Sequence, residues 1–156
     1  MHNCHMQVSK FTDFAMRILI ALASRPEACV TVRELAAAYG VSANHLSKIA
    51  AWLAQQGYLC TERGRGGGLR LAWPASGISV GEVFRQANSR DGINVSIVEC
   101  FSGNDCCAIS PACGLRPALR AAEEAFYATL DTYSLADITR QPHAFAALLG
   151  FVEHGP

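Results

Sequence analysis

Apolar side chains recur at helical spacing near the start of the chain. Phe11, Phe14, Ile18 and Leu22 follow one another at intervals of three or four positions, and Pro26 comes shortly afterwards. This period predicts an amphipathic helix that begins at Phe11 and ends before the proline, which cannot continue a helix.

Two further helices are predicted, separated by a glycine. Thr31 and Glu34 have the spacing of a capping box, so a short helix is expected to follow and to run to Gly40. Ser42 then caps a third helix, which is expected to end near Gly57. Two helices joined by a tight turn that contains glycine make a helix-turn-helix pattern.

A β-hairpin is predicted directly after these helices. Residues 58–62 and 69–73 are typical of strands, and they flank the glycine-rich segment Arg63–Gly68. In this position the hairpin is the wing of a winged helix. The fold class expected is therefore mainly α with a small β-hairpin wing: a winged helix-turn-helix DNA-binding domain plus a long dimerisation helix.

The long helix is predicted from a second apolar stripe. Leu115, Leu119, Ala122, Phe126 and Leu130 follow one another at intervals of four, three, four and four positions, close to a heptad pattern. Such a stripe either packs on its own domain or packs against a second copy of the chain. A long helix outside a small winged domain favours the homodimer.

Three segments follow from these elements. Residues 6–75 are expected to form the DNA-binding domain, 76–114 a connecting helix and a cysteine-rich loop, and 115–156 the dimerisation helix and a C-terminal tail. Within the second segment, a helix is predicted from Ser79 through Ala87 and an extended stretch over Ile93–Val98.

Composition narrows the class of protein. The chain has 156 residues, of which 51% are hydrophobic, enough for a packed core. Neither an apolar stretch of membrane-spanning length nor a secretory signal is recognisable, so a cytoplasmic location without membrane contact is expected. The net charge is zero, but residues 1–75 hold eight Lys and Arg against four Asp and Glu, whereas the remainder holds five against nine.

The basic half has the features of a DNA-binding surface. Recognition helices present polar and basic side chains near their N-terminus, and arginines on a glycine-rich wing can reach a minor groove or phosphates. The glycine-rich tip lacks the Lys-Ser/Thr that a nucleotide-binding loop requires, and no nucleophile-base pair indicates an enzyme. The candidate DNA-binding residues are Arg33, Ser42, Asn44, His45, Lys48, Arg63, Arg65, Gly66 and Gly67.

Four cysteines precede the long helix. Cys100, Cys106, Cys107 and Cys113 lie within fourteen residues, and such clustered thiolates are soft ligands suited to iron-sulfur clusters, zinc or reversible disulfides. No Cys-x-x-Cys pair indicates a zinc knuckle, but a zinc-dependent or thiol-based redox repressor remains an alternative.

The other cysteines and the two tryptophans are interpreted as structural. Cys29 and Cys60 are expected to be buried small hydrophobic residues, and Trp52 and Trp73 to pack inside the winged domain.

Nearly the whole chain resembles the NsrR group of iron-sulfur winged-helix repressors, within the wider family that includes the IscR regulators. The resemblance rests on Lys10–Arg17, on Gly64–Leu69, on Val98–Cys100 together with Cys107–Leu115, and on Ala125–Ala128 together with Tyr133–Asp137. It implies a homodimeric repressor whose cluster-loaded form binds operator double-stranded DNA. It also implies that nitric oxide destroys the cluster and releases genes for nitric-oxide detoxification. An iron or cluster-status regulator of the same family is the nearest alternative.

The resemblance also implies a ligand set. Cys100, Cys107 and Cys113 match its three cysteines, with Cys106 as the alternative to Cys107. Asp13 matches an acidic position that ligates the cluster from the partner subunit. Relatives with an IscR-type 2Fe-2S site use a histidine where this chain has Arg116, so the resemblance favours a 4Fe-4S cluster over 2Fe-2S.

Overall fold

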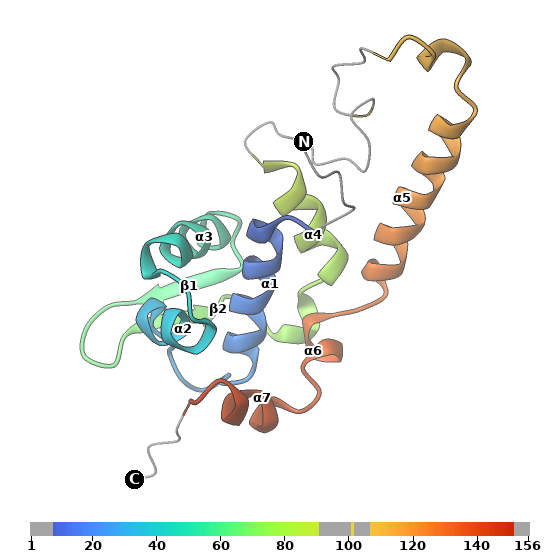
Figure 1. The fold of residues 1–156 in the computed structure, drawn as a ribbon. Coiled ribbons are helices and arrows are strands. Elements are labelled where there is room, and N and C mark those ends of the chain that lie inside the picture. The colour runs from blue at the N-terminus through green and yellow to red at the C-terminus, as the bar shows by residue number, and fades with distance from the viewer. Residues whose placement is uncertain (1–7, 91–100, 102–106, 152–156) are drawn as a thin grey trace.

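The chain is mainly helical in the parts that the computed structural model describes, residues 8–90, 101 and 107–151 (Figure 1). None of the helices in those ranges is both long and apolar enough to span a bilayer. Cys100, Cys106 and the extended stretch predicted over residues 93–98 lie outside the described residues. The elements are α1 (Lys10–Ala23), α2 (Val32–Tyr39), α3 (Ala43–Gln55), β1 (Leu59–Glu62), β2 (Gly68–Leu71), the 3-10 turns η1 (Ala75–Gly77) and η4 (Ser110–Ala112), α4 (Val80–Asn88), α5 (Leu115–Asp131), α6 (Leu135–Ile138) and α7 (Pro142–Leu148).

Side-chain caps determine where the helices begin. Helix α1 starts one residue earlier than predicted because the Ser9 hydroxyl accepts a hydrogen bond from the Thr12 backbone N–H at 3.0 Å. The predicted capping box of Thr31 and Glu34 is confirmed at α2, and Ser42 caps α3 as predicted. Ser79 caps α4 in the same way.

The helix-turn-helix and its wing are confirmed. Gly40 ends α2 with φ of +63°, a conformation that favours glycine, and α3 begins three residues later. Strands β1 and β2 pair antiparallel with Glu62 opposite Gly68 at the tip. Val30, just before α2, forms a β-bridge with Leu69, which fixes the wing against the helix-turn-helix.

Two predictions about burial in this region are wrong. Trp73 lies beyond the end of β2, and 64% of its surface is exposed, although its indole N–H donates to the Gly57 carbonyl at 3.1 Å. Cys60 is exposed because it lies on the solvent face of β1, where Leu59 is the residue that faces the core. Trp52 does pack against the core of the winged domain, partly buried, with its ring 5.2 Å from that of Phe11.

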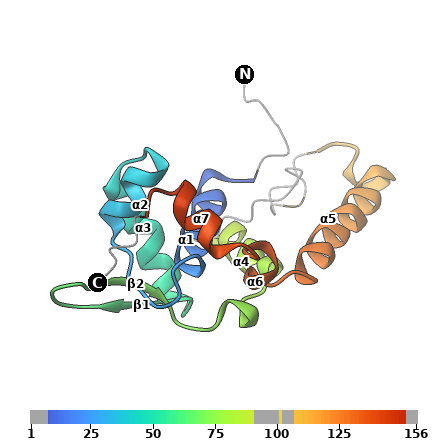
Figure 2. The same ribbon diagram turned by 90° about the horizontal axis from the view of Figure 1, so that it is seen from below.

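The hydrophobic core is centred on α1. Ile18 and Leu19 are fully buried, and Leu46 of α3 packs in the same cluster. The C-terminal helices α6 and α7 fold back onto α1, and Leu135 of α6 is also fully buried (Figures 1 and 2). Helices α6 and α7 therefore contribute to the core around α1.

Helix α5 projects from this core (Figure 1). None of its residues is buried in the single chain, and Leu115 and Phe126 are 62% and 45% exposed. Only its C-terminal half meets α4, through Phe84 against Phe126 at 6.2 Å and through an ion pair between Arg85 and Asp131. The apolar stripe of α5 thus packs partly on its own domain and partly faces outward.

Gly81 sets how closely α4 and α5 approach. A Cβ at this position would overlap the Asp131 carboxylate and lie 2.8 Å from the Asp131 backbone nitrogen. We expect Gly81→Ala to lower the free energy of unfolding by about 1 to 3 kcal/mol, the usual cost of overpacking. Urea unfolding checks this, with Gly77→Ala as the control because an added Cβ there meets nothing within 4 Å. Equal stability of the two variants would contradict the prediction.

Candidate functional site

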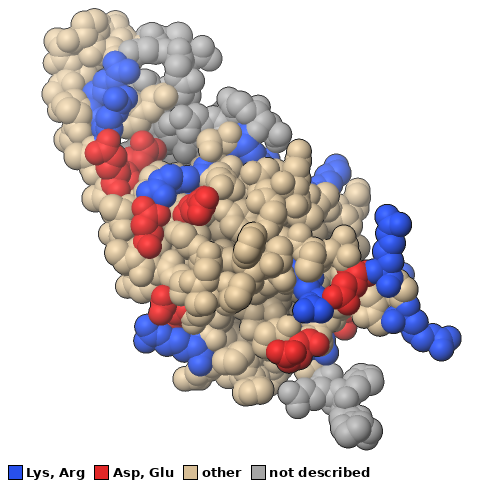
Figure 3. Space-filling model, turned by 180° about the vertical axis from the view of Figure 1, so that it is seen from behind, with Lys and Arg blue, Asp and Glu red and all other residues tan. Residues whose placement is uncertain are grey.

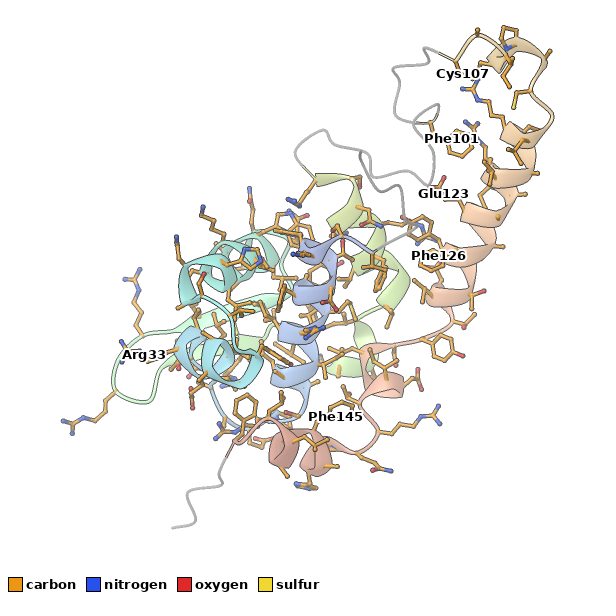
Figure 4. The ribbon with its side chains drawn as sticks, viewed as in Figure 1. Arg33, Phe101, Cys107, Glu123, Phe126 and Phe145 are labelled. Atoms are coloured by element: carbon orange, nitrogen blue, oxygen red, sulfur yellow. The ribbon has the colours of Figure 1, made fainter. Side chains whose placement is uncertain are left out.

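The predicted recognition residues lie on the exposed side of the helix-turn-helix. Asn44, His45 and Lys48 are exposed on the first two turns of α3, and Arg33 is exposed on the first turn of α2 (Figure 4). Ser42 has a structural task as well, because its hydroxyl accepts the His45 backbone N–H at 3.2 Å. This set can therefore meet base edges and phosphates together.

The ring of Phe14 packs against that of His45, a contact that the sequence analysis did not predict. The two rings meet edge to face with centroids 5.5 Å apart, and Phe14 belongs to α1. The position of the recognition helix therefore depends directly on the first half of α1.

The wing tip presents two arginines. Arg63 and Arg65 are exposed, and basic side chains project well beyond the surface at the wing (Figure 3). Gly66 has φ of +82°, and a Cβ on Gly67 would overlap the Glu62 carbonyl oxygen. The two glycines thus shape the turn from which the arginines extend.

A third arginine of the wing is engaged within the protein. Arg70 donates to Glu62 at 2.6 Å, and Glu62 also accepts from the Cys29 thiol at 3.4 Å. Burial, followed by the contact with Glu62, raises the pKa of Cys29, which keeps it a thiol. The positive field of the wing is therefore concentrated at its tip, and Cys29 lacks the thiolate character of a reactive cysteine.

Cys107 and Cys113 lie on a short turn just before α5. Cys107 is exposed and lies three residues before η4, and Cys113 is half-buried and caps the C-terminal end of η4. Ser110 N–H donates to the Cys107 carbonyl at 3.0 Å, and the Arg116 guanidinium donates to the Ser110 hydroxyl at 3.0 Å. Arg116 thus ties the turn to the first turn of α5.

Asp13 is paired with Arg17 on α1. The Arg17 Nε lies 3.1 Å from Oδ1 of Asp13 and Nη2 lies 3.0 Å from Oδ2. The guanidinium also lies over the rings of Phe14 and Tyr39, at 5.2 and 5.8 Å. Burial raises the pKa of Tyr39 to about 12, so its phenol stays protonated and donates to the Arg17 carbonyl at 2.8 Å.

The candidate metal ligands that the structure describes, Cys107, Cys113 and Asp13, do not lie together within one chain. Among the described residues, no three His, Cys, Asp or Glu side chains gather closely enough to hold a metal ion. Their chemistry nevertheless fits iron, because Cys107 and Cys113 supply thiolates from an accessible turn and Asp13 supplies a half-exposed carboxylate.

The sequence and the fold both match known transcriptional regulators. A profile of the Rrf2 family, described as "Iron-dependent Transcriptional regulator", matches residues 8–141. The HTH-type transcriptional regulator NsrR of Bacillus subtilis (strain 168) is 41% identical over 150 residues, 95% of this chain and 100% of that protein. The family and this relative are regulators and not enzymes.

Two solved structures share the fold. IscR of T. potens aligns with a TM-score of 0.66 and 23% identity, over 86% of this chain and 87% of that one. The oxidized form of CymR from Staphylococcus aureus also has a TM-score of 0.66, with 21% identity over 86% and 96% of the two chains. The winged-helix fold expected from the sequence is thereby confirmed.

Proposed function

Because the chain belongs to the Rrf2 family of transcriptional regulators, we propose that it is a repressor that senses nitric oxide through an iron-sulfur cluster. The cluster-loaded homodimer binds operator DNA, and nitrosylation or loss of the cluster releases it. Genes for nitric-oxide detoxification are then expressed. The repressor itself acts in the cytoplasm. The observation that carries this proposal is the 41% identity to an NsrR along that protein's full length.

DNA binding is assigned to the domain of residues 6–75. Its recognition residues are those exposed on α2 and α3, and the arginines of the wing tip contact phosphates or a minor groove. Gly66 and Gly67 contribute the shape of the tip, which allows a close approach of the backbone. One protomer offers a small surface, so two copies of it are needed for firm binding.

The homodimer is proposed to form along α5. The outward part of this helix carries exposed apolar residues, including Leu115 at 62%, and a second copy provides the complementary surface. A twofold axis along α5 presents two recognition helices to a pseudo-palindromic operator. In this arrangement residues 76–114 provide the connecting helix and the cluster loop, and α5 provides the dimer contact within 115–156.

The cluster is assigned to the loop before α5 and to the partner's α1. Cys100, Cys107 and Cys113 are the proposed thiolate ligands, with Cys106 as the alternative to Cys107, and Asp13 of the partner subunit is the fourth. A 4Fe-4S cluster is favoured over 2Fe-2S because Arg116 replaces the histidine of IscR-type sites. When bound, the cluster supplies iron, to which nitric oxide adds.

Arg17 is the competitor for Asp13 in this assignment. A carboxylate held by two nitrogens of Arg17 has to exchange that pair for iron, and an exposed pair of this type contributes less than about 1 kcal/mol. The exchange is therefore inexpensive, and it frees the guanidinium beside Phe14 and Tyr39.

The Asp13 assignment predicts a partial phenotype. The Asp13→Ala variant is expected to fold normally and to retain the thiolate-bound iron. The ratio between the DNA affinities of the cluster-loaded and the nitric-oxide-treated protein is expected to fall by about tenfold, because the contact between the cluster and the DNA-binding domain is lost. Fluorescence anisotropy with duplex DNA measures this, and Glu27→Ala, which removes another exposed acid, is the control. Release of DNA identical to that of the wild type would remove Asp13 from the ligand set.

The cluster itself is tested by composition. Protein purified without oxygen is expected to be coloured and to contain about four irons and four sulfides per protomer. A coloured protein that keeps its iron when nitric oxide is added would favour the second candidate, an iron or cluster-status regulator, which the family description also fits. A colourless protein after anaerobic reconstitution would leave zinc or thiol switching to explain the loop.

A further inference from the structure

Three helices meet at the side chain of Asn88, at the C-terminal end of α4. The Thr12 hydroxyl of α1 donates to Asn88 Oδ1 at 2.7 Å. The Asn88 amide nitrogen donates to the hydroxyl of Tyr127 on α5 at 3.0 Å. A carboxamide suits this junction because it holds an acceptor and a donor side by side, so it bonds two helices at once.

The junction is built into the core on the α1 side. Thr12 has no exposed surface, and its hydroxyl also contacts the Ser9 hydroxyl at 2.8 Å. Ser9 in turn caps α1. The Thr12 and Asn88 groups therefore lie in a continuous chain of hydrogen bonds, in which each buried polar atom has a partner.

On the α5 side of the junction, Tyr127 packs against Arg85 of α4. Arg85 lies over the Tyr127 ring at 5.0 Å and forms a two-pronged ion pair with Asp131, of which Nη1 to Oδ1 is 2.7 Å. Hydrogen bonding from Arg85 lowers the pKa of Asp131, so the carboxylate stays charged. The C-terminal half of α5 thus forms one unit with α4, while its far end carries the turn with Cys107 and Cys113 about 18 Å away (Figure 4).

The first turns of α1 connect the Asn88 junction to the recognition helix α3. Phe11 directly precedes Thr12 and Phe14 follows it by two residues, and their rings meet Trp52 and His45 of α3 at 5.2 and 5.5 Å. A displacement of Thr12 therefore changes the support of α3 at two points.

We propose that Asn88 is a positioning residue that couples the long helix α5 to the recognition helix α3 through the first turns of α1. The inference rests on the proposed function, because the signal that it transmits is the state of the loop before α5. It adds a route within one protomer, separate from the contact between Asp13 and the partner subunit's cluster.

The coupling is tested with a mutant cycle in the full-length protein. Thr12→Val and Tyr127→Phe each remove one hydroxyl, and the two residues are linked through Asn88. We expect the double variant to lower the urea midpoint of unfolding by less than the sum of the two single variants. This difference is expected to vanish when Asn88→Leu is also present. Additive effects in the presence of Asn88 would overturn the proposal.

A second readout separates coupling from simple loss of stability. Hydrogen-deuterium exchange of α3 peptides is expected to rise at least threefold in Tyr127→Phe, although Tyr127 lies on α5. Thr129→Val removes a hydroxyl that bonds only its own helix, at 2.9 Å to Ala125, and Thr139→Val does the same at a buried site. These controls are expected to leave α3 exchange unchanged, and equal exchange in Tyr127→Phe and Thr129→Val would refute the coupling.

The outcome does not depend on the cluster. Both measurements use the protein as purified, whatever its iron content. Absence of iron would count against the proposed function, but the mutant cycle would still report whether Asn88 links the helices. Should Asn88→Leu fail to fold, the exchange comparison between Tyr127→Phe and Thr129→Val decides the question alone.

Discussion

Replacing Cys113 with serine is expected to reduce bound iron to about one tenth of the wild-type content or less, because a serine hydroxyl is a far weaker ligand for iron than a thiolate. Loss of iron is expected to abolish the high-affinity complex with duplex DNA. The fold should survive, since Cys113 is half-buried at the end of a 3-10 turn, outside the core around α1. Iron analysis, circular dichroism and anisotropy on one preparation measure all three properties.

Cys60→Ser is the matched control for this experiment. Cys60 is an exposed thiol on β1, outside the loop, and its replacement is expected to leave the iron content unchanged. A Cys113→Ser protein with the wild-type iron content would show that this loop does not hold the cluster.

Removing both wing-tip arginines, Arg63→Ala with Arg65→Ala, is expected to weaken DNA binding on the order of 100-fold at about 0.15 M salt. In a dimer this change removes four cations, so the slope of log affinity against log salt should become shallower by roughly 3 to 4. Iron content should not change, because the wing is remote from residues 107–114, the described turn before α5 (Figure 1).

The control for this pair removes the same charge elsewhere. Arg120→Ala with Arg140→Ala takes two exposed arginines from α5 and from the turn before α7, and we expect little change in the salt slope. A wing variant with the same salt slope as the control would show that the wing does not contact DNA.

Local signals in the sequence were sufficient to predict the winged helix. The capping box of Thr31 and Glu34, the break at Gly40 and the cap at Ser42 each depend on a few neighbouring residues, and each is confirmed. The helix α6 had the same kind of signal, a capping box of Ser134 and Asp137, which the sequence analysis did not use. Helix boundaries in this chain are thus largely encoded within four residues.

Contacts between distant elements were not predictable in this way. The pairing of Phe14 with His45 and the junction at Asn88 join residues 31 or more positions apart, and they depend on how helices pack rather than on local pattern. The exposure of Trp73 has a similar origin, because the end of β2 is set by where its partner strand begins.

The candidate metal site depends on still less local information. A spacing of cysteines indicates soft ligands. In the proposed dimer, however, the packing of two chains selects which thiols would hold a cluster and which carboxylate would complete it. Asp13 illustrates this, since within its own chain it pairs with Arg17, four residues away on the same helix.

The central claim is tested most directly by measuring the affinity of the anaerobically purified protein for duplex DNA before and after nitric oxide. The duplex is first selected by the wild-type protein from a randomised pool of about 30 base pairs, enough for two half-sites one helical turn apart. We expect tight binding by the iron-loaded protein and a loss of at least about 100-fold once a few equivalents of nitric oxide have bleached its colour. Unchanged affinity after complete bleaching would contradict the account.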